Sequence, residues 1–321
     1  MDYRKIIKSR DLRIKIMHLL SWVPDKLMLK IQYRIRFGRK LNLDNPKRLT
    51  EKIQWYKLNY YDPLMVTCAG KNCVRDYVKH CGLERILNEQ YRVYECPDDV
   101  DFNELPERFV LKTTVGSAGQ QVFVCQDKSK IDEEEIREKM RMWYKLYPPM
   151  HRTNPGREWH YNAVKQEIVA EKYIDSSSSE NGLLSYKIFC FNGKARFVYL
   201  IADIKDGFFD ADYGIYSPEY KKINCKRVDA VSLDLSTPKP GNWNEMIQIA
   251  EKLSAPFPHV RVDLYNVNGQ IIFGELTFFN DGGRMKFDPD EYDYIFGDYF
   301  VLPEKKKRPS NYRQLGGVSF E

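Results

Sequence analysis

Two carboxylates stand where apolar residues are expected. Asp263 and Glu275 interrupt two apolar runs that an Asn-Gly pair separates. Removing a carboxylate from water is costly unless a partner compensates its charge. A divalent cation is one such partner, and Mg²⁺ prefers oxygen ligands of this kind. Arg261 could hold a phosphate nearby. It could equally form a structural ion pair with Glu275, so this motif alone leaves both readings open.

The register of this hairpin decides whether the carboxylates can share a cation. A two-residue Asn-Gly turn would place Asp263 and Glu275 on opposite faces of the sheet. We therefore predict a three-residue turn, 267–269, with Gly269 in the left-handed region. The expected pairs are Asn266 with Gln270, Arg261 with Glu275, and Asp263 with Phe273. One face would then carry the polar residues Arg261, Asp263, Glu275 and Thr277.

A second motif suits phosphate. Lys112 ends an apolar run, and a loop of small residues follows, formed by Gly116, Ser117, Ala118 and Gly119. Glycines let backbone N–H groups approach phosphate oxygens, and the lysine adds a charge. The loop is not a P-loop, because the G-x-x-x-x-G-K-[ST] pattern is absent. Most such turns only reverse the chain, so the motif is weak by itself.

A third motif is an apolar run that leads into Glu171, Lys172, Tyr173 and Ile174. A strand that leaves its sheet here could offer its backbone to an adenine. Taken alone, an ordinary strand with charged ends explains the pattern equally well.

Helices and antiparallel hairpins must position these residues. The sequence predicts helices at 12–36 with an interruption at Pro24, at 51–58 with Thr50 as N-cap, and at 74–80, 132–147 and 244–253. It predicts strands at 109–112, 122–126 and 167–174, and Asn-Gly hairpins of 186–191 with 194–201 and of 260–267 with 270–278. This pattern favours an α+β architecture with antiparallel sheets over a doubly wound parallel sheet.

Changes in residue composition and pattern divide the chain into five segments. We expect a basic helical extension (1–48), an N-terminal subdomain (49–108), a small subdomain with the glycine-rich loop (109–175), a C-terminal subdomain with the metal site (176–303) and a basic tail (304–321).

Positive charge is concentrated at the start of the chain. The formal net charge is +6, but residues 1–40 hold twelve basic and three acidic residues, which is +9, and the remainder carries −3. Such an arm fits an anionic glycan or the inner face of a membrane, while a helix packed on the body with a solvated basic face is the simpler reading. Nucleic acid is not expected, because no recognition signature accompanies the charge.

The composition favours a cytoplasmic protein, and a peripheral position at the inner face of the membrane stays open. The seven cysteines are odd in number, form no C-x-x-C pair and follow no signal peptide, which indicates reduced thiols. No stretch approaches the roughly eighteen apolar residues that span a bilayer.

Taken in order, these motifs resemble the ATP-grasp superfamily, and most closely the branch that resembles TupA of teichuronopeptide biosynthesis. The resemblance extends from about residue 36 to about residue 300. The segments that carry it are 37–46, 51–55, 75–78, 156–159, 189–194 and 261–277. It implies an ATP-grasp fold, in which two α+β subdomains with antiparallel sheets grip ATP.

The resemblance also implies roles for individual residues. Lys71 and Lys112 match lysines that hold ATP phosphates, and Lys187 matches a basic residue that reaches the terminal phosphates. Gly116 to Gly119 match the loop that closes over the nucleotide, and Glu171 to Ile174 match the adenine-contacting segment. Asp263 and Glu275 match the Mg²⁺-binding carboxylates, and Arg261 matches the arginine that steadies the acyl phosphate.

Three positions depart from the pattern. The branch usually has Asp where this chain has Gly70, and His where it has Val115. Many ATP-grasp ligases have Asn as a third metal ligand where this chain has Thr277, which puts a second metal ion in doubt.

The function that follows is ATP-dependent ligation of a carboxylate to an amine through an acyl phosphate, with ATP and Mg²⁺ as cofactors. The expected partners are a carboxylate-bearing sugar or polysaccharide of the bacterial surface and an amine nucleophile. Three alternatives stay open: a glycosyltransferase whose metal is held by Asp210 and Asp212, a glycan kinase of the same fold, and a non-catalytic nucleotide-binding module. No Ser-His-Asp or Cys-His arrangement is evident, and His160 is the only histidine of interest.

Overall fold

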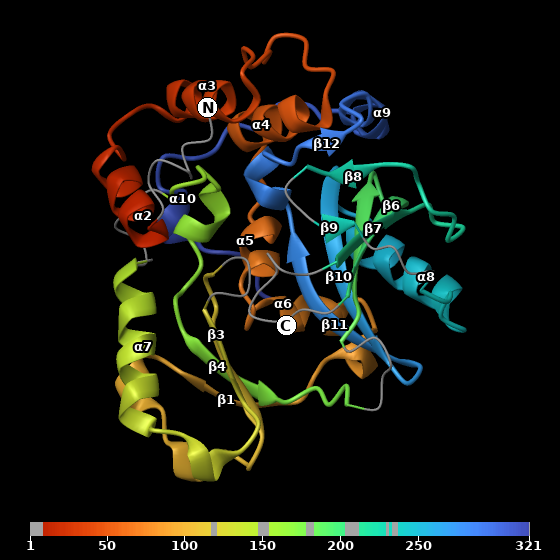
Figure 1. Ribbon diagram of the computed structural model, residues 1–321. Helices are drawn as coiled ribbons and strands as arrows, with labels where there is room; N and C mark the ends of the chain where they lie inside the picture. The colour runs from red at the N-terminus through yellow and green to blue at the C-terminus, as the bar shows by residue number, and fades with distance from the viewer. Residues whose placement is uncertain are drawn as a thin grey trace.

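Two sheets face one another across the middle of the molecule in the computed structural model (Figure 1). The structure describes residues 9–116, 121–146, 154–177, 183–202, 212–228, 231–232 and 237–320. Helices and mostly antiparallel strands are mixed along the chain, which confirms the predicted α+β class.

The smaller sheet has four antiparallel strands in the order β1-β4-β2-β3. They are β1 (Gln90–Tyr94), β2 (Phe109–Thr113), β3 (Val122–Cys125) and β4 (Ile168–Lys172). Helix α7 (Glu133–Leu146) covers this sheet with an apolar face. Ile136, Met140 and Trp143 of α7 pack in one cluster with Phe109, Leu111 and Ile168 of the strands.

The larger sheet has six strands in the order β11-β10-β5-β6-β7-β9. They are β5 (Ser185–Phe191), β6 (Lys194–Ala202), β7 (Asp212–Tyr216), β9 (Val231–Ser232), β10 (His259–Val267) and β11 (Gln270–Thr277). All neighbours are antiparallel except β7 and β9, which run parallel. Helix α8 (Trp243–Ser254) packs on this sheet, and β8 (Lys226–Arg227) pairs with β12 (Phe287–Asp288).

Helices near the start of the chain frame the two sheets. They are α2 (Arg10–Leu19), α3 (Asp25–Phe37), α4 (Leu49–Asn59), α5 (Leu64–Ala69) and α6 (Val74–His80). Pro24 separates α2 from α3 as predicted. Thr50 is not the N-cap of the next helix, because that helix begins at Leu49. The Thr50 N–H and hydroxyl instead donate to the Asp293 carboxylate, at 2.9 and 2.7 Å.

The remaining elements are short. They are the 3₁₀ turns η1 (Glu84–Ile86), η2 (Pro97–Asp99), η3 (Phe102–Glu104), η4 (Lys128–Lys130), η5 (Trp159–Asn162) and η6 (Asn280–Gly283), and the helices α9 (Tyr292–Tyr299) and α10 (Tyr312–Leu315). The C-terminal segment lies against α4 and α5. The Lys306 N–H donates to the Asn59 carbonyl at 2.8 Å, and the Val318 N–H donates to the Thr67 hydroxyl at 2.7 Å.

The two sheets have separate hydrophobic cores. The chain leaves the smaller sheet at the end of β4 and enters the larger sheet at the start of β5. Any ligand held by residues of both sheets therefore bridges two separately packed units.

Candidate active site

The turn between β10 and β11 has two residues. Val267 pairs with Gln270, and Asn268 and Gly269 both have positive φ, at 53° and 82°. These angles belong to the Asn-Gly turn with a left-handed residue at each central position, whose twist matches that of the strands. The prediction of a three-residue turn is therefore wrong, although Gly269 is left-handed as expected.

A bulge at Gly274 restores the register that the short turn removes. Leu264 pairs with Phe273 but Asp263 pairs with Glu275, so Gly274 has no partner of its own. One extra residue shifts every side chain beyond it to the other face of the strand. Asp263 and Glu275 therefore lie directly opposite one another. Arg261 is opposite Thr277 rather than Glu275, which corrects the predicted pairs.

The polar residues of this hairpin nevertheless share one face and contact each other. The Arg261 guanidinium donates to both oxygens of Asp263, at 2.6 and 2.7 Å. It also donates to Glu275 Oε1 and Thr277 Oγ1, each at 2.9 Å, and to the Asn280 side chain. The Lys187 ammonium, opposite Asp263 on β5, forms an ion pair with the same carboxylate. This arrangement confirms the segregation predicted from the alternating sequence.

Positive charges dominate the surroundings of Glu275. Burial by itself raises the pKa of its carboxyl. The nearby cations, Arg261 first among them, outweigh burial and lower the pKa to about 2. Burial lowers the pKa of the Lys187 ammonium, and the Asp263 carboxylate partly offsets this effect. Lys71 also lowers the pKa of Glu275, so three cations act on this one carboxylate.

The donor set suits Mg²⁺ that arrives with phosphates. Asp263 and Glu275 supply carboxylate oxygens, and the Thr277 hydroxyl is 3.1 Å from Glu275 Oε1. In the described part of the chain no cluster of three or more His, Cys, Asp or Glu residues converges. Mg²⁺ is commonly bound by one or two carboxylates together with substrate phosphates and waters, so two acidic ligands are enough.

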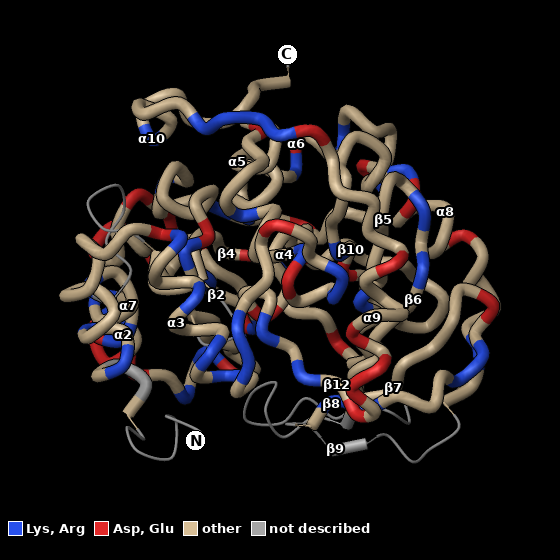
Figure 2. The backbone as a smooth tube through the Cα atoms, turned by 90° about the horizontal axis from the view of Figure 1, so that it is seen from above, with Lys and Arg blue, Asp and Glu red and all other residues tan. Residues whose placement is uncertain are grey.

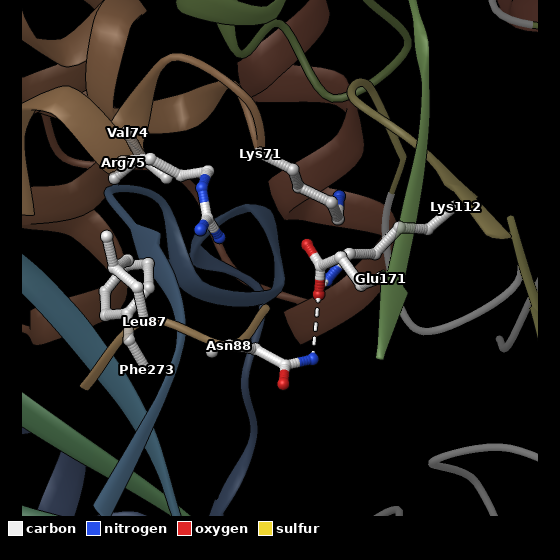
Figure 3. A pocket seen from close by; sticks show the side chains of 9 residues that line it. Lys71, Val74, Arg75, Leu87, Asn88, Lys112, Glu171 and Phe273 are labelled. Atoms are coloured by element: carbon white, nitrogen blue, oxygen red, sulfur yellow. Dashed lines mark hydrogen bonds and ion pairs between the residues drawn. The ribbon is translucent and has the colours of Figure 1, made fainter. Parts of the chain in front are cut away.

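The other half of the site lies on the smaller sheet and the loop before α6 (Figure 3). The Lys112 ammonium is 2.6 Å from Glu171 Oε2, which joins neighbouring strands β2 and β4. Lys71 points toward this pair and has no ion pair or hydrogen bond with any described residue. Burial lowers the pKa of the Lys71 ammonium. These two lysines and one carboxylate line a single pocket.

The same pocket contains residues that the sequence did not single out. Its lining includes Arg75 and Asn88, with Val74, Leu87 and Phe273 as apolar walls. Arg75 extends toward the middle of the pocket, and no described residue pairs with its guanidinium (Figure 3). The Asn88 amide donates to Glu171 at 3.5 Å and to the Lys172 carbonyl at 2.8 Å. Position 75 lies in a segment that carries the family resemblance, and this was the available signal.

Two tyrosines also border the acidic hairpin. Tyr265 follows Asp263 on the same face of β10, and its ring lies 3.3 Å from where a Cβ at Gly274 would be. Burial raises the pKa of the Tyr161 hydroxyl, and the charges of Glu275 and Arg261 act on it as well. Neither residue belongs to a motif that sequence spacing could reveal.

The other predicted site residues are placed as follows. Gly116 lies beside the Gln121 and Thr113 side chains, whereas Ser117, Ala118 and Gly119 are outside the described residues. Lys172 ends β4 with its ammonium 3.2 Å from Glu89, and Tyr173 and Ile174 follow beyond the strand. Asp210 is outside the described residues, and Asp212 begins β7. His160 is buried, and burial lowers its pKa to about 3.

The model of the TupA-like ATP-grasp family matches residues 51–301, well over half of the chain. The chain belongs to the TupA-like ATP-grasp family. This result confirms the family and the fold predicted from the sequence. No match is found among curated proteins.

Solved structures similar to this TupA-like chain include several ligases. D-alanine–D-alanine ligase from Bacillus anthracis is 17% identical, with a TM-score of 0.39 over 66% of this chain and 57% of that one. L-amino acid ligase from Bacillus licheniformis is 14% identical, with a TM-score of 0.46 over 88% and 64%. The chain thus spans less than two thirds of either ligase.

Packing bears on two departures of this TupA-like chain from its branch. A Cβ at Gly70 would lie 3.1 Å from Val164 Cγ1, so the backbone next to Lys71 is tightly packed. Val115, where the branch has His, is buried, and its carbonyl accepts from the Thr113 hydroxyl at 2.8 Å. Neither position offers a charged group to the pocket.

Proposed function

We propose that this protein is an ATP-dependent ligase that activates a carboxylate as an acyl phosphate and joins it to an amine. One observation carries the proposal. The acidic pair, Asp263 and Glu275, lies with Arg261 and Lys187 on the β5–β10–β11 face, and Lys71 adds a third cation from the loop before α6. The Lys112–Glu171 pair faces them from the other sheet. Phosphates and a divalent cation fit between such groups.

In the first step a carboxylate oxygen attacks the terminal phosphorus of ATP. The bond from that phosphorus to the β–γ bridging oxygen breaks, ADP leaves, and an acyl phosphate forms. Lys71, Lys112 and Lys187 would hold the phosphates and offset the charge that moves onto ADP. Asp263 and Glu275 would hold Mg²⁺, which would further neutralise the phosphate oxygens.

In the second step the amine nitrogen attacks the acyl carbon. A tetrahedral oxyanion forms, the nitrogen loses a proton to water or to the departing phosphate, and the bond to phosphate breaks to leave an amide. Arg261 would stabilise this oxyanion and the departing phosphate, because its guanidinium already lies among the acidic ligands. Its five N–H donors allow it to keep one carboxylate while it turns toward the substrate.

The substrate class is proposed from the family resemblance. The TupA-like branch resembles a protein of teichuronopeptide biosynthesis, which supports a uronic acid, free or in a bacterial surface polysaccharide, as the carboxylate. An amino acid would then supply the amine. Capsule or cell-wall polymer synthesis at the cytoplasmic side of the membrane is the setting that fits this chemistry.

Trapping with hydroxylamine tests the proposal. Purified protein is incubated with ATP, Mg²⁺ and a panel of uronic acids, with hydroxylamine in place of the amine. An acyl phosphate reacts with hydroxylamine to give a hydroxamate, which mass spectrometry detects with one equivalent of ADP and of phosphate. Arg261→Lys is the variant to compare, because it keeps the charge and removes the fork of donors.

Each alternative predicts a different result. A glycan kinase would form ADP with acceptor alone, keep the phosphate on the product and give no hydroxamate. A glycosyltransferase using Asp210 and Asp212 would consume a nucleotide sugar and leave ATP unchanged. A binding module would turn over neither.

A further inference from the structure

The first two helices expose an unusual amount of apolar surface. Fourteen large hydrophobic side chains are exposed in the described part of the chain, and six of these fall between residues 12 and 35. They are Leu12, Leu19, Trp22, Leu27, Ile31 and Ile35. Leu19 and Trp22 are 75% and 77% exposed. Clustered apolar exposure of this kind marks an interaction site rather than ordinary surface.

Helix α3 shows the pattern most clearly. Leu27, Ile31 and Ile35 recur every fourth residue and therefore lie along one side of the helix. The inner side is occupied by the buried Met28, Leu29 and Tyr33. The outer apolar stripe is thus not needed to hold the helix on the protein.

Positive charge lies on the same two helices. Lys15, Lys26, Lys30 and Arg34 form no ion pair with any described residue. The Asp25 carboxylate cannot neutralise them, because Arg157 and Arg308 bind it at 3.2 and 3.1 Å. Figure 2 shows Lys and Arg along both helices. The surface that faces outward is therefore both apolar and cationic.

We propose that the α2–α3 surface, formed by these six apolar and four basic residues, docks on an anionic lipid surface. The apolar side chains would enter the boundary between headgroups and acyl chains, and the cations would meet lipid phosphates. Each basic residue near such a surface strengthens binding roughly fivefold. A soluble acidic polysaccharide would use the charges but would leave the apolar stripe in water.

The helices lie on the membrane in this proposal and do not cross it. They have 10 and 13 residues, whereas a spanning helix needs about 20. Within the described ranges no helix is long and apolar enough to cross a bilayer.

Trp22 provides a built-in probe. Of the five tryptophans it alone is exposed, since Trp55, Trp143, Trp159 and Trp243 are all buried. We expect its fluorescence to shift to shorter wavelength with vesicles of phosphatidylcholine and about one third phosphatidylserine, and not with phosphatidylcholine alone. Brominated lipids should quench the same emission. The signal should be absent in Trp22→Phe, while co-sedimentation of that variant with vesicles continues.

Two surface variants separate the contributions of apolar and charged side chains. The apolar variant is Leu27→Ser, Ile31→Ser and Ile35→Ser; the charge variant is Lys26→Glu, Lys30→Glu and Arg34→Glu. Each should lower vesicle affinity at least tenfold and leave circular dichroism and ATP binding unchanged. The matched controls lie elsewhere on the surface and should bind vesicles like the parent. They are Ile295→Ser with Val301→Ser, and Lys221→Glu with Lys239→Glu.

Three results would overturn the proposal. The first is absence of vesicle binding by the parent protein. The second is binding that the apolar variant retains in full and that a soluble polyuronate abolishes, which would assign the surface to an anionic glycan. The third is a dimer detected by light scattering that the apolar variant dissociates while vesicles have no effect, which would assign it to a second copy of the chain.

Discussion

Asp263 and Glu275 stand directly opposite one another across the β10–β11 pair, although the two-residue turn between their strands would by itself put them on opposite faces. The bulge at Gly274 makes the difference, and it places both carboxylates within reach of Arg261. The acidic pair therefore depends on a residue that carries no side chain.

Replacing Gly274 by alanine should disturb this arrangement. The added Cβ would lie 3.0 Å from the Asp263 carbonyl oxygen, which is backbone and cannot move aside cheaply. We expect a loss of about 1–3 kcal/mol in the free energy of unfolding and weaker ATP binding in the presence of Mg²⁺. Gly269→Ala is the control, because nothing lies within 4 Å of its Cβ and only backbone strain at φ 82° opposes it. Equal ATP affinity in the two variants would contradict the role of the bulge.

Asp263→Asn should abolish the effect of Mg²⁺ on ATP affinity. Calorimetric titration of ATP with Mg²⁺ and with a chelator in its place measures this effect directly. The variant also leaves Lys187 and Arg261 with less negative charge, so it should lose about 3–5 kcal/mol of stability. Thr277→Asn, which restores the more common ligand, should keep or increase the Mg²⁺ effect. If Asp263→Asn responds to Mg²⁺ like the parent, the metal lies elsewhere.

Lys112→Ala should weaken ATP binding by about 1.5–3 kcal/mol, the loss expected for a charge-assisted contact. Its ion pair with Glu171 complicates a single substitution, because removing the lysine strands a buried carboxylate. A double-mutant cycle with Glu171→Gln separates the two contributions. Additive losses would mean that each residue contacts the nucleotide independently of the other.

Arg75→Ala should lower ATP affinity roughly tenfold, or about 1.4 kcal/mol. Its guanidinium has no described partner, so stability should change by less than about 0.5 kcal/mol. Arg85→Ala, which removes a surface pair with Glu245, serves as a matched control for lost charge. A stability loss without an affinity loss would make Arg75 a structural residue.

Stability should fall as the pH drops from about 6.5 toward 4. Burial lowers the pKa of His160 to about 3 and that of His259 to about 4, well below the value of about 6.5 in an unfolded chain. In this pH window the two histidines are protonated in the unfolded state and neutral in the folded state. The free energy of unfolding therefore falls by up to about 1.4 kcal/mol per pH unit for each histidine.

Urea unfolding at several pH values measures this slope. His160→Gln should reduce the slope by about one proton, whatever its cost at neutral pH. The difference between parent and variant also cancels the effect of Glu158, whose pKa burial raises and which acts in the opposite sense. An unchanged slope would show that His160 is protonated inside the folded protein.

The polar face of the hairpin could be predicted from alternation alone, whereas the way in which it is built could not. A three-residue turn and a two-residue turn with a later bulge each add one residue to the register. Gly269 and Gly274 can each supply that extra residue, so the sequence does not distinguish them. Lys112 and Glu171 could be singled out because each follows an apolar run. Arg75 was missed because a basic residue on a short helix is usually solvated, and only the fold turns it into the pocket.

The separation of the two hydrophobic cores has a calorimetric consequence. The cluster under the four-stranded sheet is much smaller than the other, so its melting transition should come first, and Lys112 and Glu171 should become disordered with it. The acidic hairpin, embedded in the larger core, would outlast that transition. Heating would thus produce a partly unfolded species. It would keep Asp263 and Glu275 in register but would have lost the half of the proposed nucleotide site that the smaller sheet provides. In the proposed function ATP contacts both halves, so bound ATP should stabilise them together and merge the two endotherms into one.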